Sequence, residues 1–266
     1  MNSPKRLLDR KQVQSQFDRA AVTYDNVASL QRQMGSDLLQ QIMKHGIAKD
    51  GHLIDLGCGT GELLQQLELA GFSKLFGLDL SSQMISVAEQ KAPSVNFHHA
   101  AIEEMPFDEC GFDIVVSNAA IQWCDIQSAA IEIFRVMKPE ARLFANVFSK
   151  GTLSQWHDAF LVGGFESRVH PLANSNEIET AFESAGLENI EIETRKETTS
   201  FESVKSMFDS IRQLGATNAM SSRSRSFSRT EYLTLKDHFQ TVLESNHKLE
   251  LGFEWVQISA EKMARR

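Results

Sequence analysis

The spacing of apolar and polar residues follows two different patterns along this chain, and the pattern changes near residue 50. Over residues 10–45 apolar side chains recur every three or four positions, which predicts helices. From Leu53 to Phe148 short apolar runs alternate with helical stretches, and this pattern predicts five βα units of a parallel sheet. The expected strands include 53–56, 74–79, 112–117 and 141–148, and Lys138-Pro139 ends the helix before the last of them. The pattern therefore predicts an α/β fold with a doubly wound, mostly parallel sheet.

The C-terminal part of the chain extends this sheet and adds a long insertion. A helix is expected over 174–186, ended by Gly186, and strands are expected at 189–198 and 249–259, the last of them antiparallel. These strands bring the sheet to seven. Between them, two helical stretches carry more apolar residues than a linker needs. We therefore expect a single domain over 1–266, with an N-terminal helical cap at 1–46 and a helical lid insertion at 201–246.

A glycine-rich turn follows the first expected strand, in the run Leu53-Ile-Asp-Leu-Gly-Cys-Gly-Thr-Gly61. Its three glycines lack a Cβ, so the backbone can turn sharply and come close to a ligand. The next residues have helical spacing, which places the turn at a helix N-terminus with free N–H groups and partial positive charge. Such a turn can hold a carboxylate.

The spacing of the glycines separates two classes of cofactor fold. A dinucleotide fingerprint, G-x-G-x-x-G, would need a third glycine at position 62, which is Glu62. The third glycine instead comes one residue earlier. Together with the acid two residues before the first glycine, this resembles the cofactor turn of S-adenosylmethionine (AdoMet) methyltransferases. We expect this part of the AdoMet site to comprise Asp55, Gly57, Gly59 and Gly61.

A second acid, Asp79, ends the second strand about 20 residues after the glycines, where α/β nucleotide folds hold a ribose diol. The alternative is that Asp79 caps the following helix. The loop after the third strand is expected at the adenine, and the end of the fourth strand is expected in the cleft. These positions add Leu80, Ile102, Glu103 and Asn118 to the expected cofactor set.

Composition and charge narrow the possible functions. The 266 residues carry a formal net charge of −8, which argues against a general nucleic-acid binder. The three cysteines have no metal-ligand spacing, so reduced thiols in a cytoplasmic protein are expected and no metal site is. No apolar run approaches the roughly 18 residues of a membrane span. We expect a monomer.

Four runs in this chain carry a resemblance to a known family: Asn118-Ala-Ala-Ile-Gln-Trp-Cys124, Phe17-Asp-Arg-Ala-Ala-Val-Thr-Tyr24, Leu30-Gln-Arg-Gln33 and Leu214-Gly-Ala-Thr-Asn218. Together they resemble the malonyl-acyl-carrier-protein O-methyltransferases of biotin synthesis. The resemblance covers residues from about 11 to 258. It implies methyl transfer from AdoMet to the free carboxylate of a malonyl thioester, giving the methyl ester that starts pimeloyl synthesis. It also implies that Tyr24, Gln122 and Trp123 lie between cofactor and acceptor. The alternative for the two aromatic residues is an ordinary core or cleft-wall position.

The chain departs from this family at two places. Ala101 stands where the family usually has an aspartate that meets the adenine amino group, so Glu103 or backbone groups must replace that contact. Val169-His-Pro171 stands where the family often has Asn-Arg-Phe. If that arginine holds the acceptor carboxylate, Arg168 or His170 is expected to replace it.

Acyl carrier proteins are strongly acidic, so an enzyme with net charge −8 needs a local positive patch to dock one. Arg223, Arg225 and Arg229 in the expected lid supply such a patch, unless they form an ordinary solvated loop. Two other functions stay open. One is a small-molecule methyltransferase of the same fold, acting for example on a quinone precursor. The other is a non-catalytic AdoMet-binding protein, which Ala101 keeps open.

Overall fold

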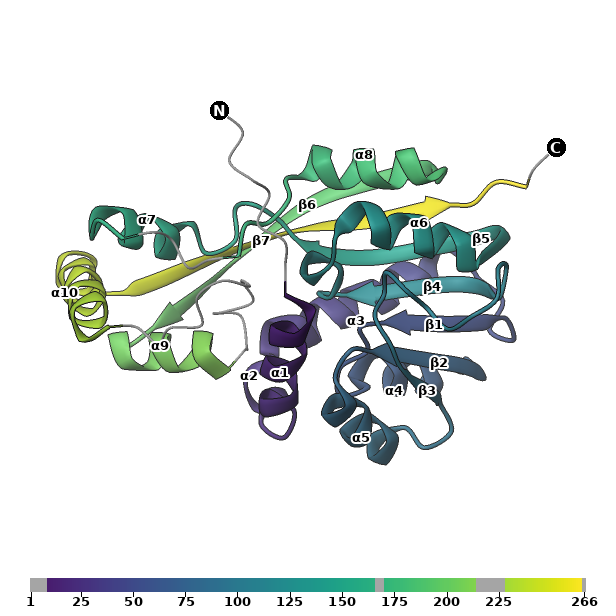
Figure 1. The fold of residues 1–266 in the computed structure, drawn as a ribbon, viewed down its shortest axis with the longest axis horizontal. Helices are drawn as coiled ribbons and strands as arrows, with labels where there is room; N and C mark the ends of the chain where they lie inside the picture. The colour runs from purple at the N-terminus through teal and green to yellow at the C-terminus, as the bar shows by residue number, and fades with distance from the viewer. Residues whose placement is uncertain (1–8, 166–169, 214–227, 265–266) are drawn as a thin grey trace.

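The structure is a computed structural model that describes residues 9–165, 170–213 and 228–264, and these residues form a seven-stranded sheet with helices on both faces (Figure 1). The strands are β1 (His52–Leu56), β2 (Lys74–Asp79), β3 (Asn96–His99), β4 (Phe112–Asn118), β5 (Met137–Phe148), β6 (Glu188–Phe201) and β7 (Leu249–Glu261). The helices are α1 (Arg10–Ala20), α2 (Tyr24–Val27), α3 (Ser29–Lys44), α4 (Glu62–Leu69), α5 (Ser82–Lys91), α6 (Ile126–Val136), α7 (Ser154–Val162), α8 (Ser175–Ala185), α9 (Val204–Gln213) and α10 (Arg229–Asn246), with a 3₁₀ turn η1 (Ile121–Trp123).

The strand order is β3-β2-β1-β4-β5-β7-β6. Strands β1 to β5 pair in parallel, whereas β7 lies antiparallel between β5 and β6. A dinucleotide fold would continue instead with a sixth parallel strand. The predicted fold class and the antiparallel last strand are both confirmed.

Two apolar clusters hold the helices against opposite faces of the sheet. On β1, Leu53 packs into a cluster with α3 and α4, whereas Ile54 packs into the cluster with α6 and α8. Adjacent residues of a strand face opposite sides, so Asp55 points to the side of Leu53, which α3 and α4 cover. The first strand thereby places its one acid beneath the N-terminal helices.

The prediction of five βα units is wrong after β3, because residues 100–111 form a loop without a helix. Ile102 and Met105 in this loop are buried against the sheet. Arg135 of α6 also holds the loop, since its Nη1 donates to the carbonyl oxygen of Phe107 at 2.7 Å. Buried side chains and one guanidinium replace the helical hydrogen bonds.

A third apolar cluster lies at the outer end of the antiparallel β6–β7 pair, which extends beyond the other strands (Figure 1). We call it the distal cluster; it comprises α7, the described parts of α9 and α10, and the outer half of β7. At its centre the ring of Trp156 stacks on Phe239 at 5.3 Å and meets Phe208 edge-on at 4.7 Å. The two expected helices of 201–246 are confirmed as α9 and α10, whereas α7 has no counterpart in the sequence prediction.

Three amide side chains stand side by side on β4, β5 and β7 and anchor α3. The Nδ2 of Asn146 donates to Asn118 Oδ1 at 3.0 Å and to the carbonyl oxygen of Met34 at 2.9 Å. The Nδ2 of Asn118 donates to the carbonyl oxygen of Gln31 at 2.8 Å, and Gln257 Nε2 donates to Asn146 Oδ1 at 3.4 Å. This amide ladder fixes α3 across the carboxyl ends of the central strands.

Replacing Asn146 by alanine is expected to lower the free energy of unfolding by about 1–3 kcal/mol, because buried partners lose their donor. Asn96→Ala, at an exposed position of β3, is the matched control and should change it by less than about 0.5 kcal/mol. Urea unfolding of both variants measures the difference. Equal, small effects would show that the ladder does not anchor α3.

Candidate active site

The glycine turn is forced into its shape by a close approach to η1. Gly57 has a φ of +71°, and a Cβ at this position would lie 2.2 Å from the Cβ of Ala120. The N–H groups of Gly57 and Cys58 donate to the carbonyl oxygen of Leu78 at 2.7 and 3.0 Å. The turn is therefore locked between the ends of β2 and β4.

Gly59 differs, because its φ is +52° but no heavy atom lies within 4 Å of the position where a Cβ would stand. This side of the turn faces open space. Gly61 is the N-cap of α4 and has a φ of +79°. A Cβ added at Gly61 would lie 3.0 Å from the Cβ of Ala88. Only the middle glycine of the three leaves room for a ligand beside the backbone.

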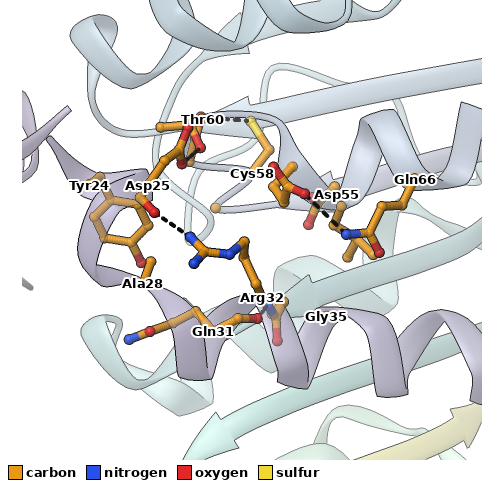
Figure 2. A pocket seen from close by; sticks show the side chains of 15 residues that line it. Tyr24, Asp25, Ala28, Gln31, Arg32, Gly35, Asp55, Cys58, Thr60 and Gln66 are labelled. Carbon is orange, nitrogen blue, oxygen red and sulfur yellow. Dashed lines mark hydrogen bonds between the residues drawn. The ribbon is translucent and has the colours of Figure 1, made fainter. Parts of the chain in front are cut away.

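Two cavities meet at this turn, with volumes of about 510 and 660 Å³ including their open mouths. The first lies between the turn and the helices α2 and α3 (Figure 2). The second runs along the ends of β2 and β4 beneath α1. Residues common to both linings are Tyr24, Gly57, Gly59 and Asn118.

Asp55 lies in the wall of the first cavity and is 2% exposed. Its buried Oδ1 has no hydrogen-bond partner. Burial, with a contribution from the charge of Asp79, raises the pKa of Asp55 to about 8. At neutral pH this acid is therefore mostly protonated unless a cation enters the cavity and stabilises the carboxylate.

Asp79 lies in the second cavity and accepts backbone hydrogen bonds on both oxygens, from Gly59 N and Ser81 N at 2.8 Å each. Burial raises its pKa, and these two N–H groups act in the opposite direction. The side-chain cap of α5 is Ser81, whose Oγ accepts from Met84 N at 3.1 Å. The interpretation of Asp79 as the helix cap is therefore wrong.

The rest of the second cavity combines apolar residues with one ion pair. Leu80, Ala101 and Ile102 line it together with Glu103. Glu103 lies 3.5 Å from the guanidinium of Arg10 and accepts from Asp125 N at 3.3 Å. Its carboxylate is thus held in the wall by α1 and by the loop after η1.

An aromatic group closes the second cavity. Phe17 meets Trp123 edge-on at 5.7 Å and Tyr24 at 6.4 Å. On the other side, His170 stacks on Trp123 at 5.4 Å, and its Nε2 donates to the carbonyl oxygen of Gln122 at 2.8 Å. Burial lowers the pKa of His170, so the neutral ring is favoured. Burial, followed by the charges of nearby acids, raises the pKa of Tyr24, which keeps its phenol protonated.

Gln122 lines neither cavity. Its side chain is buried, and its Nε2 donates to the carbonyl oxygen of Ala119 at 2.6 Å. Gln122 and His170 therefore stand behind Trp123, and among these residues it is the tryptophan that reaches the cavity.

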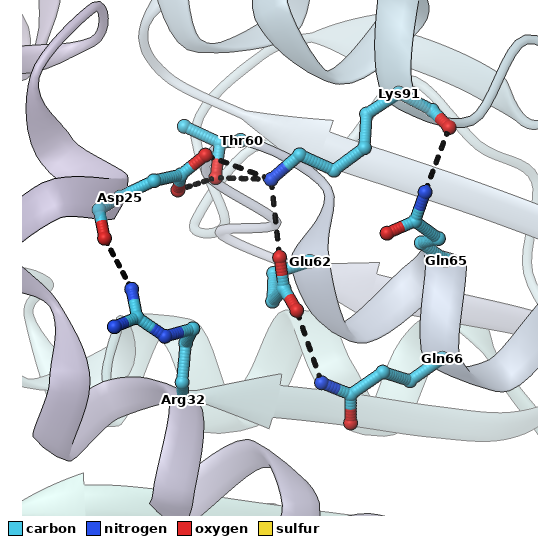
Figure 3. A network of polar contacts seen from close by, with 7 residues as sticks. All are labelled: Asp25, Arg32, Thr60, Glu62, Gln65, Gln66 and Lys91. Carbon is cyan, nitrogen blue, oxygen red and sulfur yellow. Dashed lines mark hydrogen bonds and ion pairs between the residues drawn. The ribbon is translucent and has the colours of Figure 1, made fainter.

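A polar network ties α2 to the glycine turn (Figure 3). Thr60 Oγ1 donates to Asp25 Oδ1 at 2.6 Å, and Lys91 Nζ lies 2.8 Å from Asp25 Oδ2 and 3.1 Å from Glu62 Oε2. Sequence reasoning missed this network, because its members come from three helices and the turn. At the neighbouring loop, Ser81 Oγ donates to Asp18 of α1 at 2.6 Å.

Comparison with known proteins decides the family. A methyltransferase-domain family matches residues 54–145. The malonyl-[acyl-carrier protein] O-methyltransferase of Serratia marcescens is 30% identical over 219 residues, covering 82% of this chain and 83% of the relative. The enzyme of that name from Herminiimonas arsenicoxydans is 27% identical over 257 residues, or 96% and 97% of the two chains. The chain belongs to the malonyl-[acyl-carrier protein] O-methyltransferase family.

As a member of this family the protein is an AdoMet-dependent O-methyltransferase. Its fold is shared with phosphoethanolamine N-methyltransferase 2 of Haemonchus contortus, solved with S-adenosylhomocysteine, at a TM-score of 0.61 and 20% identity. That match covers 95% of this chain and 61% of the other. Within the described residues there is no helix long and apolar enough to cross a membrane and no metal-binding group of three His, Cys, Asp or Glu.

The structure brings nearly all the expected cofactor residues of this methyltransferase to the two cavities, with Gly61 just beyond them at the start of α4. Of the expected docking residues, His170 lies behind Trp123. Arg229 is the exposed first residue of α10 and lines neither cavity. The other three expected arginines, Arg168, Arg223 and Arg225, lie outside the described residues.

Gly57→Ala is expected to lower the free energy of unfolding by about 3 kcal/mol or more, because a left-handed backbone and a clash with Ala120 add together. Gly59→Ala shares the left-handed backbone without the clash, so a loss of about 1–2 kcal/mol is expected. Urea unfolding without cofactor compares them. A loss for Gly59→Ala that equals the loss for Gly57→Ala would contradict the packing argument.

Asp55→Asn is expected to stabilise the cofactor-free protein at pH 7 by about 2–4 kcal/mol. The folded protein keeps a proton on Asp55 up to a pKa of about 8, whereas the unfolded chain loses it near pH 4. The stability of the natural protein relative to the variant should therefore fall as pH rises from about 4 to 8. Thermal unfolding of both proteins across this range measures the effect, and parallel pH profiles would refute it.

Proposed function

We propose that this enzyme transfers the methyl group of AdoMet to the free carboxylate of malonyl-acyl carrier protein, giving the methyl ester that starts pimeloyl and biotin synthesis. The observation that carries the proposal is the position of the run Asn118-Ala-Ala-Ile-Gln-Trp-Cys124. Its first residue lines both cavities and its tryptophan lines the aromatic wall. The names of the relatives over most of the chain length support the same acceptor.

The acids that line the two cavities have the hydrogen-bonding properties that AdoMet needs. In the second cavity, we infer that Asp79 accepts hydrogen bonds from the ribose hydroxyls, while Leu80 and Ile102 pack on the adenine and Glu103 borders it. In the first, the unpartnered oxygen of Asp55 suits the donor's ammonium group. The open side of Gly59 and the start of α4 at Gly61 leave backbone room for the methionine part.

AdoMet supplies a methyl group on a positively charged sulfur, and the malonyl carboxylate is already ionised at neutral pH. The reaction therefore needs no general base, and the residues of this chain act by orienting and enclosing the reactants. Alignment of this kind can lower a barrier by roughly 7–11 kcal/mol. Since opposite charges neutralise each other during transfer, a dry wall built by Tyr24 and Trp123 favours the reaction.

We infer that Gln122 and His170 position Trp123 from behind. We also propose that either Arg168 or His170 replaces the family arginine and contacts the acceptor carboxylate. Tyr24 keeps its proton, so its hydroxyl can donate a hydrogen bond at the junction of the two cavities.

The distal cluster is proposed as the lid of a single-domain enzyme, with α1 to α3 as its cap. Helix α9 contacts α2, so the two parts meet at a helix that borders the first cavity. The proposed partner is an acidic carrier protein, docked by Arg223, Arg225 and Arg229. The chain is proposed to act as a cytoplasmic monomer without a metal ion.

Methyl transfer from labelled AdoMet tests the acceptor directly. Malonyl-acyl carrier protein is expected to be labelled rapidly, malonyl-CoA at least about tenfold less efficiently, and the acetyl and succinyl carrier proteins poorly. The acetyl form is the matched control, because it lacks the carboxylate that receives the methyl group. Labelling of the succinyl form at the malonyl rate would contradict the choice of the malonyl carboxylate. No labelling of any carrier would contradict the proposal and favour a small-molecule acceptor. Absence of AdoMet binding would contradict both the carrier-protein and the small-molecule acceptor, because both reactions need this donor.

A further inference from the structure

One arginine of α3 projects into the space between that helix and the glycine turn (Figure 2). Among the residues that line the first cavity, the acids are Asp25, Asp55 and Glu62, and Arg32 is the single cation. An amino-acid carboxylate placed among three acids would be repelled unless their charge is neutralised and a cation faces it.

Lys91 neutralises two of the three acids. Its ammonium lies 2.8 Å from Asp25 and 3.1 Å from Glu62, and both carboxylates are partly exposed (Figure 3). Burial would raise the pKa of Asp25, but this contact, the Thr60 hydroxyl and the charge of Arg32 lower it. These two carboxylates therefore already have a counter-ion before any ligand enters.

The third acid and the cation make no such ion pair among the described residues. Asp55 makes no ion pair in the described parts of the chain, and its Oδ1 has no partner at all. Arg32 donates from Nη1 to a backbone carbonyl oxygen, that of Asp25, and within the described residues it makes no ion pair with a carboxylate. The cavity thus presents one acid and one guanidinium that have no ion-pair partner among the described residues and can pair with the charges of a ligand.

We propose that Arg32 binds the carboxylate of the donor's methionine part, while Asp55 faces its ammonium group. An α-amino acid carries these two charges one carbon apart, and the cavity offers their complements on opposite walls. A guanidinium can also hold a carboxylate through two parallel hydrogen bonds, which a single ammonium cannot. The inference rests on the proposed placement of the donor in the two cavities.

The position of Arg32 is fixed before the ligand binds. Its helix is anchored to the sheet by the amide ladder through the carbonyl oxygens of Gln31 and Met34. Its own bond to the Asp25 carbonyl reaches the residue next to Tyr24. Donor binding at Arg32 would therefore also hold α2, and with it the aromatic ring at the cavity junction.

Calorimetric titration with three ligands tests the proposal without the acceptor or catalysis. S-Adenosylhomocysteine carries the carboxylate, decarboxylated AdoMet lacks only that group among the charges of AdoMet, and 5′-methylthioadenosine lacks the whole amino-acid part. Arg32→Gln should weaken S-adenosylhomocysteine about 10- to 100-fold. It should change the other two affinities by less than about threefold. Arg19→Gln, at an exposed position of α1, is the matched control and should change none.

Arg32→Lys provides a second variant that keeps the charge but loses the fork. It should weaken S-adenosylhomocysteine less than Arg32→Gln does, again without affecting methylthioadenosine. Equal losses for all three ligands would show that Arg32 only holds α2 in place, and an unchanged S-adenosylhomocysteine affinity would remove it from the site; either result overturns the proposal. If the natural protein bound methylthioadenosine but not S-adenosylhomocysteine, the donor placement itself would fall.

Discussion

The closeness of Gly57 to Ala120 is the constraint on which the site depends. A Cβ at this glycine would overlap the alanine, so the turn can close only with a left-handed glycine there. In this position the turn's N–H groups bond to the end of β2, and the N–H of Gly59 reaches Asp79. One tight contact between β1 and β4 thereby sets the glycine turn, orients the second acid and leaves the open side of Gly59 facing the two cavities.

The N-terminal helices complete the site through polar contacts that an apolar interface could not supply. Asp18 binds Ser81 at the end of β2, Asp25 binds Thr60 in the glycine turn, and Asn146 holds α3 from below. Hydrogen bonds are directional, so these contacts determine both where the helices lie and how they are oriented. They hold the helices over the glycine turn, and the two cavities lie between the helices and the turn.

Asp55 shows how such a site stores part of its binding energy. A buried carboxyl without a hydrogen-bond partner is unfavourable when ionised, and this is why the pKa of Asp55 is raised. A cationic ligand relieves the cost, so the cofactor-free enzyme is less stable at neutral pH than its packing alone would allow. Arg32, which makes no ion pair with a carboxylate in the part of the chain that the structure describes, is the complementary case. Binding of a zwitterion would satisfy both groups together.

The sequence by itself determined the features that depend on neighbouring residues. Most of the strand and helix periodicity, the glycine turn and the acid at the end of β2 are local patterns, and the structure confirms them. Helix α7 and the helix-free loop before β4 were not predicted, because the aromatic core around Trp156 and the contacts of Arg135 decide them. Only the tertiary structure joined Lys91 to Asp25, which are 66 residues apart. It thereby decided which acids of the cavity have a counter-ion and which do not. Local patterns fix backbone conformation, whereas the charge left over in a cavity depends on which distant side chains meet there.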